Sequence, residues 1–266
     1  MVKGFILAGW NDLRRIVSRA DVVLEVVDAR EPMNTRSRKL EKIVYELGRE
    51  LIIVLNKSDL VPRTVVEEWA RLLKNRGYNV AYIAATKHMG TRILRRKIKE
   101  AAPALPVIVA VTGYPKTGKS SIINALKGRH SASTSPIPGS PGYTHHAQLY
   151  RVEKNILMID TPGIIPVEGS SLERILRGIS PEQLDDPVPP AVELIRRIIK
   201  YSPNAFIRAY GISSKDPYVI LEELAVKRGW YYRTTKEPLI EESARTIIRD
   251  YHKGKIPYYV KPHEYI

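Results

Sequence analysis

The residues with the clearest chemistry form a glycine-rich stretch that begins at Gly113. Gly113, Gly118, Lys119 and Ser120 fit the pattern G-x4-G-K-[ST] without departure, between the apolar run PVIVAVT and the helical pattern SSIINALKG. Glycines allow backbone N–H groups to converge on phosphate oxygens at the start of a helix, where the helix dipole favours anions. The stretch therefore predicts a strand, a phosphate-binding loop and a helix, in that order.

The phosphate end of the site needs further partners, and the sequence offers candidates. Lys119 is expected to reach the β- and γ-phosphates, and Ser120 to bind Mg²⁺ through its hydroxyl. Asp160 ends the apolar run ILMID and is the second predicted Mg²⁺ ligand, although an Asp at this position can also simply form a turn. Thr144 is the third predicted ligand, closing over Mg²⁺ only when the γ-phosphate is present. Gly163 is expected to offer a backbone N–H to the γ-phosphate.

These assignments give a defined set of residues. The catalytic candidates are Lys119, Thr144 and Gly163, with Lys116 as a further candidate. The predicted nucleotide contacts at the phosphate end are Tyr114, Pro115, Lys116, Thr117, Gly118, Lys119, Ser120, Ser121 and Gly163.

A second motif, Asn56-Lys57-Ser58-Asp59, follows the apolar run LIIVL and suits the recognition of guanine. One Asp59 carboxylate can accept hydrogen bonds from the ring N–H and the exocyclic amine of guanine, a donor pair that adenine lacks. Asn56 is expected to brace the loops, and the Lys57 stem to cover the base. Alone the motif could be a surface turn, but YIAATKHMG follows, where Ala84 and Ala85 are expected to border the base. The Ala85 backbone amide is expected to read the guanine carbonyl.

The two motifs stand in an unusual order, because the base reader precedes the phosphate loop. A cyclic shift of the chain restores the usual GTPase order, with the join in the connector AAPALP, 101–106. Such a rejoining need not disturb a core, since domain termini are often close together. The sequence therefore predicts a circularly permuted P-loop GTPase domain.

Periodicity supplies the elements that must position these motifs. Short apolar runs alternate with helical patterns, which predicts an α/β fold with a mostly parallel sheet and helices on both faces. Expected strands are 22–28, 51–56, 80–84, 107–113 and 156–160; expected helices are 36–48, 64–76, 90–101 and 119–127. From about residue 172 only helical patterns and turns follow. We predict a GTPase domain at 1–171 and a small α-helical C-terminal domain at 172–266, expected to contact RNA.

Composition favours a polyanionic partner. The formal net charge is +15, and residues 1–171 hold 27 basic and 15 acidic residues, or +12. An excess of this size favours nucleic acid through counterion release, although a basic solubilising surface is the alternative. The chain has no Cys and no apolar run long enough to cross a bilayer, so we expect a cytoplasmic protein without a membrane partner. The predicted RNA-contact residues are Arg92, Arg95, Arg96, Lys97 and Lys99.

The motif order, together with DAREP at 28–32 and the closing ARTIIRDYHKGKIPYY, resembles the YlqF/YawG group of circularly permuted GTPases. The resemblance spans nearly the whole chain. It implies GTP and GDP as bound nucleotides, Mg²⁺-dependent hydrolysis of GTP to GDP and phosphate, and a role in assembling the large ribosomal subunit through contact with rRNA. We expect a monomer away from the ribosome.

Three departures from the group bear on catalysis. Lys116 stands where many members carry an Asn associated with K⁺, so we expect no K⁺ at this site; an exposed lysine without this role is the alternative. Ile164 follows Gly163 where many GTPases carry a Gln, and it cannot orient water, so hydrolysis should be slow unless the ribosomal subunit stimulates it. The first histidine is His88, which leaves His145 and His146 as substitutes for the histidine near the N-terminus of the bacterial branch, although solvated or RNA-facing side chains are the more common case.

Two other readings remain open. One is a non-catalytic RNA-binding module that GTP only stabilises. Ile164 is compatible with this alternative. The other is a P-loop enzyme that uses ATP, which Asp59 argues against. Turnover separates the first alternative from a GTPase, and nucleotide competition separates the second.

Overall fold

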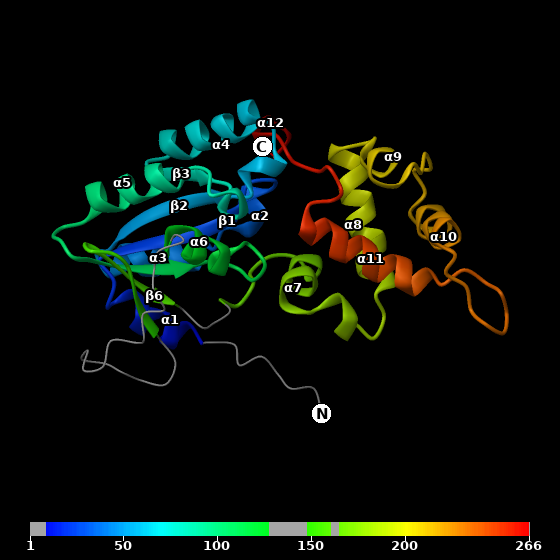
Figure 1. Cartoon of the computed structure of the whole chain (residues 1–266), viewed down its shortest axis with the longest axis horizontal. Coiled ribbons are helices and arrows are strands. Elements are labelled where there is room, and N and C mark those ends of the chain that lie inside the picture. The colour runs from blue at the N-terminus through cyan, green and yellow to red at the C-terminus, as the bar shows by residue number, and fades with distance from the viewer. Residues whose placement is uncertain (1–8, 128–147, 161–164, 266) are drawn as a thin grey trace. The chain divides into compact units, whose positions relative to one another are not determined.

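The first of two units contains a six-stranded sheet. The computed structural model describes residues 9–127, 148–160 and 165–265 (Figure 1). The first unit is Met1–Val167 and the second is Glu168–Ile266. Strands β1 and β2 are Val22–Asp28 and Glu50–Asn56, while β3 and β4 are Asn79–Ile83 and Val107–Thr112. The last two strands are β5 (Gln148–Glu153) and β6 (Ile156–Asp160).

The strands are ordered β3-β2-β1-β4-β6-β5, and all neighbours are parallel except β5 and β6. Every residue of β1 is buried, as expected of a mostly apolar strand between two parallel neighbours. Strand β4, which leads into the phosphate loop, therefore lies at an inner position of the sheet beside β1. In the sequence it is the fourth strand and not the first.

Helices cover both faces of the sheet. On one face, α5 (Thr91–Ala101) and α6 (Lys119–Lys127) bury Leu94, Ile98 and Ile122 beside alternate residues of β1. On the other face, α1 (Trp10–Val17) and α3 (Arg38–Glu46) bury Leu13 and Leu40. Two more helices complete the described part of this unit, α2 (Pro32–Thr35) and α4 (Arg63–Asn75).

The second unit has its own apolar core. Its helices are α7 (Ser171–Gly178), α8 (Val188–Tyr201), α9 (Ala205–Tyr210), α10 (Pro217–Arg228), α11 (Ile240–Lys253) and α12 (Pro262–Tyr265). Leu194, Leu221, Ile247 and Tyr251 are among its fully buried side chains. A membrane-spanning helix is not found in the described part of the chain, because each helix there is too short or too polar.

The predicted fold class is confirmed: the sheet is mostly parallel, helices lie on both faces, and helices follow it. Each expected strand and helix of the first unit is present to within about three residues. Strand β5 and the helices α1 and α2 were not predicted from the sequence. QLYRVE follows a long Ser-, Pro- and Gly-rich segment and pairs antiparallel to β6 at the edge of the sheet, so it lacks the buried apolar run that identifies the inner strands.

Candidate nucleotide-binding site

The predicted motifs meet at one edge of the sheet. Strands β1, β2, β3, β4 and β6 run parallel, so their carboxyl ends share this edge. The register pairs Asp28 with Asn56, and Asn56 with Ile83, at the ends of three strands. In open parallel sheets, ligands bind outside the carboxyl ends of the strands. The phosphate loop and both base loops are therefore neighbours although they are far apart in sequence.

Glycine is required at both ends of the phosphate loop. Gly113 has φ +132° and Gly118 has φ +100°, a region that side chains other than glycine rarely adopt. A Cβ atom on Gly113 would lie 2.4 Å from the main-chain oxygen of Val26, and one on Gly118 would lie 2.2 Å from Nδ2 of Asn56. The loop thus packs directly on β1 and on the end of β2.

The rest of the loop is closed by its own hydrogen bonds. Thr117 is fully buried, and its hydroxyl donates to the carbonyl of Tyr114 at 2.8 Å. The Lys119 ammonium donates to the carbonyls of Gly113 (2.9 Å) and Tyr114 (2.8 Å), so it lies across the loop. Tyr114 itself is buried beside α1. Helix α6 begins at Lys119, so the orphan N–H groups of its first turn lie beside the loop.

The other predicted phosphate-end residues lie in this loop or the first turn of α6. Pro115 and Lys116 are half-buried in the loop, and Lys116 has the left-handed φ of +64°. Ser120 is exposed and Ser121 half-buried in the first helical turn. Their contacts with a nucleotide stay predictions.

Asn56 joins the phosphate loop to a base loop. Its Nδ2 donates to the carbonyl of Thr117 at 2.9 Å, and its Oδ1 accepts from the backbone N–H of Ala85 at 3.3 Å. The side chain is only 2% exposed, so both bonds form away from water. This is the bracing arrangement that the sequence motif predicts for Asn56.

The same contact corrects the expected role of Ala85. Its N–H points to Asn56 and is buried, so it does not face a base. The next residue, Thr86, makes no hydrogen bond within the described structure and lies exposed in the 3₁₀ turn Ala85–Lys87. We therefore expect the Thr86 amide to read the guanine carbonyl, with Ala84 and Ala85 as its support. The sequence pattern locates the turn but not which of two successive amides faces outward.

Asp59 lies beside this second base loop. It belongs to the 3₁₀ turn Ser58–Leu60, and its Oδ2 is 3.1 Å from Nζ of Lys87. The Asp59 side chain is 13% exposed, against 59% for Lys87. The carboxylate is thus sheltered yet accessible, as a group that reads a base edge must be, and the two base loops are linked through it.

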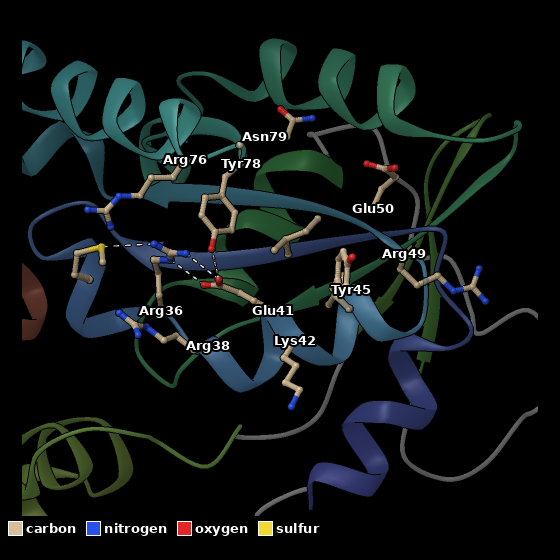
Figure 2. Close-up of a pocket in the computed structure, with 14 residues that line it drawn as sticks. Arg36, Arg38, Glu41, Lys42, Tyr45, Arg49, Glu50, Arg76, Tyr78 and Asn79 are labelled. Carbon is tan, nitrogen blue, oxygen red and sulfur yellow. Dashed lines mark hydrogen bonds and ion pairs between the residues drawn. The ribbon is translucent and has the colours of Figure 1, made fainter.

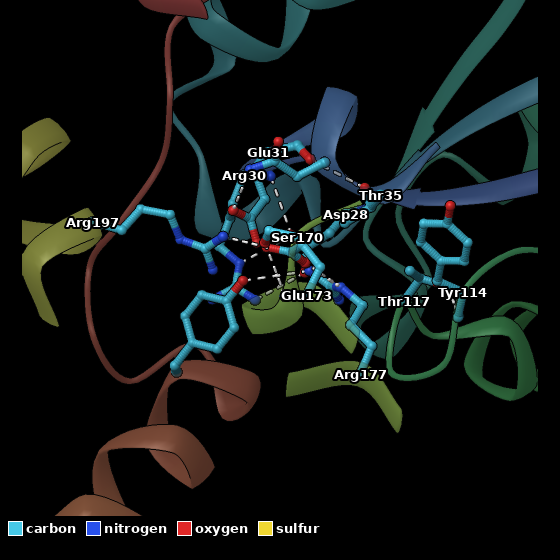
Figure 3. Close-up of polar contacts among 12 residues, drawn as sticks. Asp28, Arg30, Glu31, Thr35, Tyr114, Thr117, Ser170, Glu173, Arg177 and Arg197 are labelled. Carbon is cyan, nitrogen blue, oxygen red and sulfur yellow. Dashed lines mark hydrogen bonds and ion pairs between the residues drawn. The ribbon is translucent and has the colours of Figure 1, made fainter. Parts of the chain in front are cut away.

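Sequence reasoning missed one partner of the base reader. Lys57 has the left-handed φ of +60°, and its ammonium lies 2.8 Å from Oδ2 of Asp28 at the end of β1. Arg30 also binds this carboxylate, through Nε (3.0 Å) and Nη2 (2.8 Å), and Thr35 contacts the Asp28 backbone N–H (Figure 3). Asp28 therefore fixes the direction of the lysine whose stem we expect to cover the base. The sequence indicates only that Asp28 and Asn56 each end an expected strand, and the register shows that the two ends are adjacent.

The predicted magnesium ligands are only partly within the described residues. Ser120 lies on the first turn of α6, and β6 ends at Asp160, which the register places opposite Val111 of β4. A hydroxyl and a carboxylate are hard oxygen donors that suit Mg²⁺. Thr144 and Gly163, with Ile164, His145 and His146, lie outside the described residues. Within the described part of the chain, no cluster of three or more His, Cys, Asp or Glu side chains offers another metal site.

Three of the five basic side chains of α5 that are predicted to contact RNA form hydrogen bonds or ion pairs within the protein. Lys97 donates to Oδ1 of Asn79 (2.9 Å), while Arg95 and Lys99 both pair with Glu153, at 2.8 and 2.7 Å. Arg92 is exposed without a partner among the described residues, and Arg96 makes only a 3.6 Å pair with Glu100. Two of the five predicted contacts therefore remain available to an outside phosphate.

A phosphate loop after an inner strand, a guanine-type motif after β2 and a second base loop after β3 define a P-loop nucleotide-binding domain of the GTPase kind. Residues 8–169 match the family model described as RsgA GTPase. The chain belongs to this family, and its order of motifs is circularly permuted as the sequence indicated.

Individual relatives agree with this assignment. An uncharacterized GTP-binding protein of Methanocaldococcus jannaschii is 36% identical, covering 93% of this chain and 65% of that protein. Nucleolar GTP-binding protein 2 of Neurospora crassa is 32% identical, covering 94% and 41%. The crystal structure of GNP-bound YlqF from T. maritima has a TM-score of 0.67 at 24% identity, covering 94% of this chain and 96% of that chain. The chain thus spans from two-fifths to about two-thirds of the length of these two curated relatives.

Proposed function

We propose that this chain binds GTP and GDP and hydrolyses GTP to GDP and phosphate in the assembly of the large ribosomal subunit. The observation that carries the nucleotide part is the double hydrogen bond of Asn56, which ties the phosphate loop to the base loop. A site built this way holds the base and the phosphates of one nucleotide in fixed relation. The predicted domain division, a GTPase domain to 171 followed by an RNA-contacting helical domain, belongs to this proposal.

Different residues are proposed to bind the base and the phosphates. Asp59 and the Thr86 amide read guanine, Lys57 covers the base from its anchor on Asp28, and the loop amides with Lys119 hold the phosphates. Bound Mg²⁺ would neutralise charge on the β- and γ-phosphate oxygens, held through Ser120 with Asp160 and Thr144. Lys119 places a fixed positive charge where the transferring phosphoryl group gains charge.

Hydrolysis is proposed to be slow in the isolated protein. Ile164 has no hydrogen-bonding group with which to orient water. A bound ribosomal subunit is the proposed source of the missing group. The names of nucleolar relatives and the net charge of +15 support an rRNA partner, and we propose a cytoplasmic protein that is monomeric away from the ribosome.

The test is the GTP turnover rate of the purified chain with and without large ribosomal subunits, with Lys119→Ala as the inactive control. Stimulation of about 10³-fold, at the lower end of what a completing residue supplies in trans, would support the proposal. Tight GTP binding without turnover in either condition would instead identify a nucleotide-stabilised RNA-binding module. Equal competition by ATP would contradict the guanine assignment.

A further inference from the structure

A cleft of about 680 Å³ opens on the first unit, away from the nucleotide loops. It lies between α3 and the turn that joins α4 to β3, and it extends to the start of β2 (Figure 2). Tyr78, on that turn, donates to Oε2 of Glu41 on α3 at 2.9 Å, so the two walls are fixed to each other. Neither the nucleotide site nor the predicted RNA-contact residues of α5 account for it.

The cleft is positively charged. Five basic side chains line it against two acidic ones: Arg36, Arg38, Lys42, Arg49 and Arg76, with Glu41 and Glu50. Arg36 is the one that is neutralised, because it forms a bidentate pair with Glu41 (2.9 and 2.8 Å) and covers the Tyr78 ring at 4.5 Å. The cleft therefore contains one ion pair with balanced charges, between Arg36 and Glu41, and further basic side chains around it.

The remaining cations are available to an outside anion. Arg38 and Arg76 are exposed and have no acidic partner among the described residues. Lys42 makes only a 3.9 Å contact with Glu46 while 76% exposed. Arg49 is the exception, because its Nη2 donates to the carbonyl of Ser18 at 2.7 Å and its Nε is buried. Cations held this way along a cleft suit a chain of phosphates better than a single anion.

An exposed aromatic ring stands among these cations. Tyr45 on α3 lines the cleft and is 86% exposed, the largest exposed fraction among the large hydrophobic side chains described. An exposed ring offers a stacking surface to a base, but only where that base is unpaired and turned out of a helix. Phosphate-binding cations beside a free ring are the arrangement used for single-stranded nucleic acid.

From this arrangement we infer that the cleft binds an unpaired segment of RNA, with a base stacked on Tyr45 and the backbone on Arg38, Lys42 and Arg76. The inference rests on the proposed RNA partner but names a different surface from α5, whose Arg95, Lys97 and Lys99 are bound within the protein. An acidic peptide would satisfy the cations but would leave the ring without a role.

The test measures binding of the full chain to a fluorescent oligouridylate of twelve nucleotides, to a twelve-base-pair RNA duplex and to polyglutamate, over a range of salt. Tyr45→Ala should weaken oligouridylate binding about tenfold and leave the duplex unchanged. Tyr45→Phe, which keeps the ring, should bind like the wild type. The double variant Arg38→Gln/Arg76→Gln should lower the salt slope by about 1.4, since each single-strand phosphate contact contributes about 0.7. Arg92→Gln/Arg96→Gln removes the same charge from α5, outside the cleft, so Tyr45→Ala added to this double variant should still weaken oligouridylate binding about tenfold.

Unchanged oligouridylate binding in both cleft variants would overturn the inference. So would a loss confined to polyglutamate, which would identify a peptide site. Nucleotide affinity of each variant, measured alongside, should equal that of the wild type and shows that the fold is intact. Because these probes contain no ribosome, a failure of the proposed function, seen as absent stimulation of GTP turnover by subunits, is distinguishable from a failure of the cleft to bind RNA.

Discussion

The side-chain amide of Asn56 donates a hydrogen bond to the main-chain carbonyl of Thr117 across 2.9 Å, although the two residues are 61 positions apart. Through Oδ1 the same side chain also accepts from Ala85. One buried amide thus ties the phosphate loop to the loop that is proposed to read guanine. Its loss should affect folding and nucleotide binding together.

Asn56→Ala tests this coupling. The substitution leaves a buried carbonyl and a buried N–H without partners, so we expect the free energy of unfolding to fall by about 2–4 kcal/mol. The affinities for GTP and GDP should fall by similar factors, because base and phosphates lose their common support. Urea denaturation and nucleotide titration measure the two effects.

Asn75→Ala, at the exposed end of α4, is the matched control and should change neither quantity. Normal stability of Asn56→Ala would show that water or neighbouring groups replace both hydrogen bonds. Weakened GTP binding with intact GDP binding would place the effect at the γ-phosphate instead of at the loop junction.

Gly113→Ala should prevent the phosphate loop from forming. The new Cβ atom would lie 2.4 Å from the Val26 oxygen, a backbone atom of β1 that cannot rotate away. Strained backbone alone costs about 1–3 kcal/mol, and the clash adds to it. We expect a loss of GDP binding in calorimetry and a lower midpoint in urea.

Gly48→Ala provides the comparison for Gly113→Ala. Gly48 also has a positive φ, +60°, but a Cβ atom there would meet nothing within 4 Å. This variant should lose some stability and keep its nucleotide affinity. Equal behaviour of the two variants would mean that close approach to β1 is unimportant.

Asp59→Asn should change the base that the site prefers. An amide offers one acceptor and one donor, so it loses a charge-assisted bond to guanine and can donate to the second carbonyl of xanthine. At about 1.5–3 kcal/mol per charged hydrogen bond, GDP affinity should fall at least tenfold while xanthosine diphosphate affinity rises. Competition between the two nucleotides is the measurement, and an unchanged preference would remove Asp59 from the base-reading role.

Glu25 should make stability depend on pH. It is fully buried on β1, and its Oε1 accepts from the Ser37 N–H at 2.6 Å. Burial, and secondarily the charge of Glu41, raises the pKa of Glu25 well above its usual value. The folded state therefore keeps a proton that the unfolded state releases. Its stabilising effect is complete below the unfolded pKa, near 4.5, and is lost as pH rises through the folded pKa.

Glu25→Gln retains the acceptor for Ser37 but cannot ionise. In the wild type, the free energy of unfolding should fall by about 1.4 kcal/mol per pH unit above the unfolded pKa, until the folded pKa is reached. The variant should lack this slope and be the more stable protein at neutral pH. Urea melts from pH 4 to pH 8 measure it, with the exposed Glu50→Gln as control. A variant less stable than the wild type at neutral pH would contradict the argument.

Lys116 should make hydrolysis independent of the monovalent cation. It occupies the fourth position of the phosphate loop with a φ of +64°, and its ammonium can supply the positive charge that K⁺ supplies beside an Asn. Turnover in KCl and NaCl at equal ionic strength should therefore match. Lys116→Asn should introduce stimulation by K⁺. Strong K⁺ stimulation of the unaltered chain would show that Lys116 does not take this role.

Much of this architecture could be predicted because its signals are local. The runs at Val22–Asp28 and Val107–Thr112 are mostly apolar, as strands buried on both faces usually are. At Gly113 and Gly118 of the phosphate loop, the positive φ and the close neighbouring atoms leave glycine as the residue type that fits. The cyclic order of motifs then fixes which strand lies beside which.

Other features depend on contacts that no local pattern records. The Ala85 amide and the neighbouring Thr86 amide are equivalent in sequence, and only the Asn56 side chain distinguishes them. The sequence predicts that Arg95 and Lys99 contact RNA, whereas both pair with Glu153 of β5, a strand that the sequence pattern does not indicate. Asp28 acts on Lys57 across two strands, so its role emerges only when the register is known.

Because the strands are circularly permuted in the chain, the two base loops are synthesised before the phosphate loop. Chains emerge from the N-terminus onward, so β1, β2, β3 and both base loops exist before β4. Val22 cannot pair with β4 until Val109 has been synthesised. The side-chain amide of Asn56 likewise lacks its acceptor, the carbonyl of Thr117, until that residue has been added. The chain therefore cannot bind a nucleotide in this way until its middle has been synthesised. A nascent fragment that ends before Gly113 contains the proposed guanine-reading loop but not the phosphate loop.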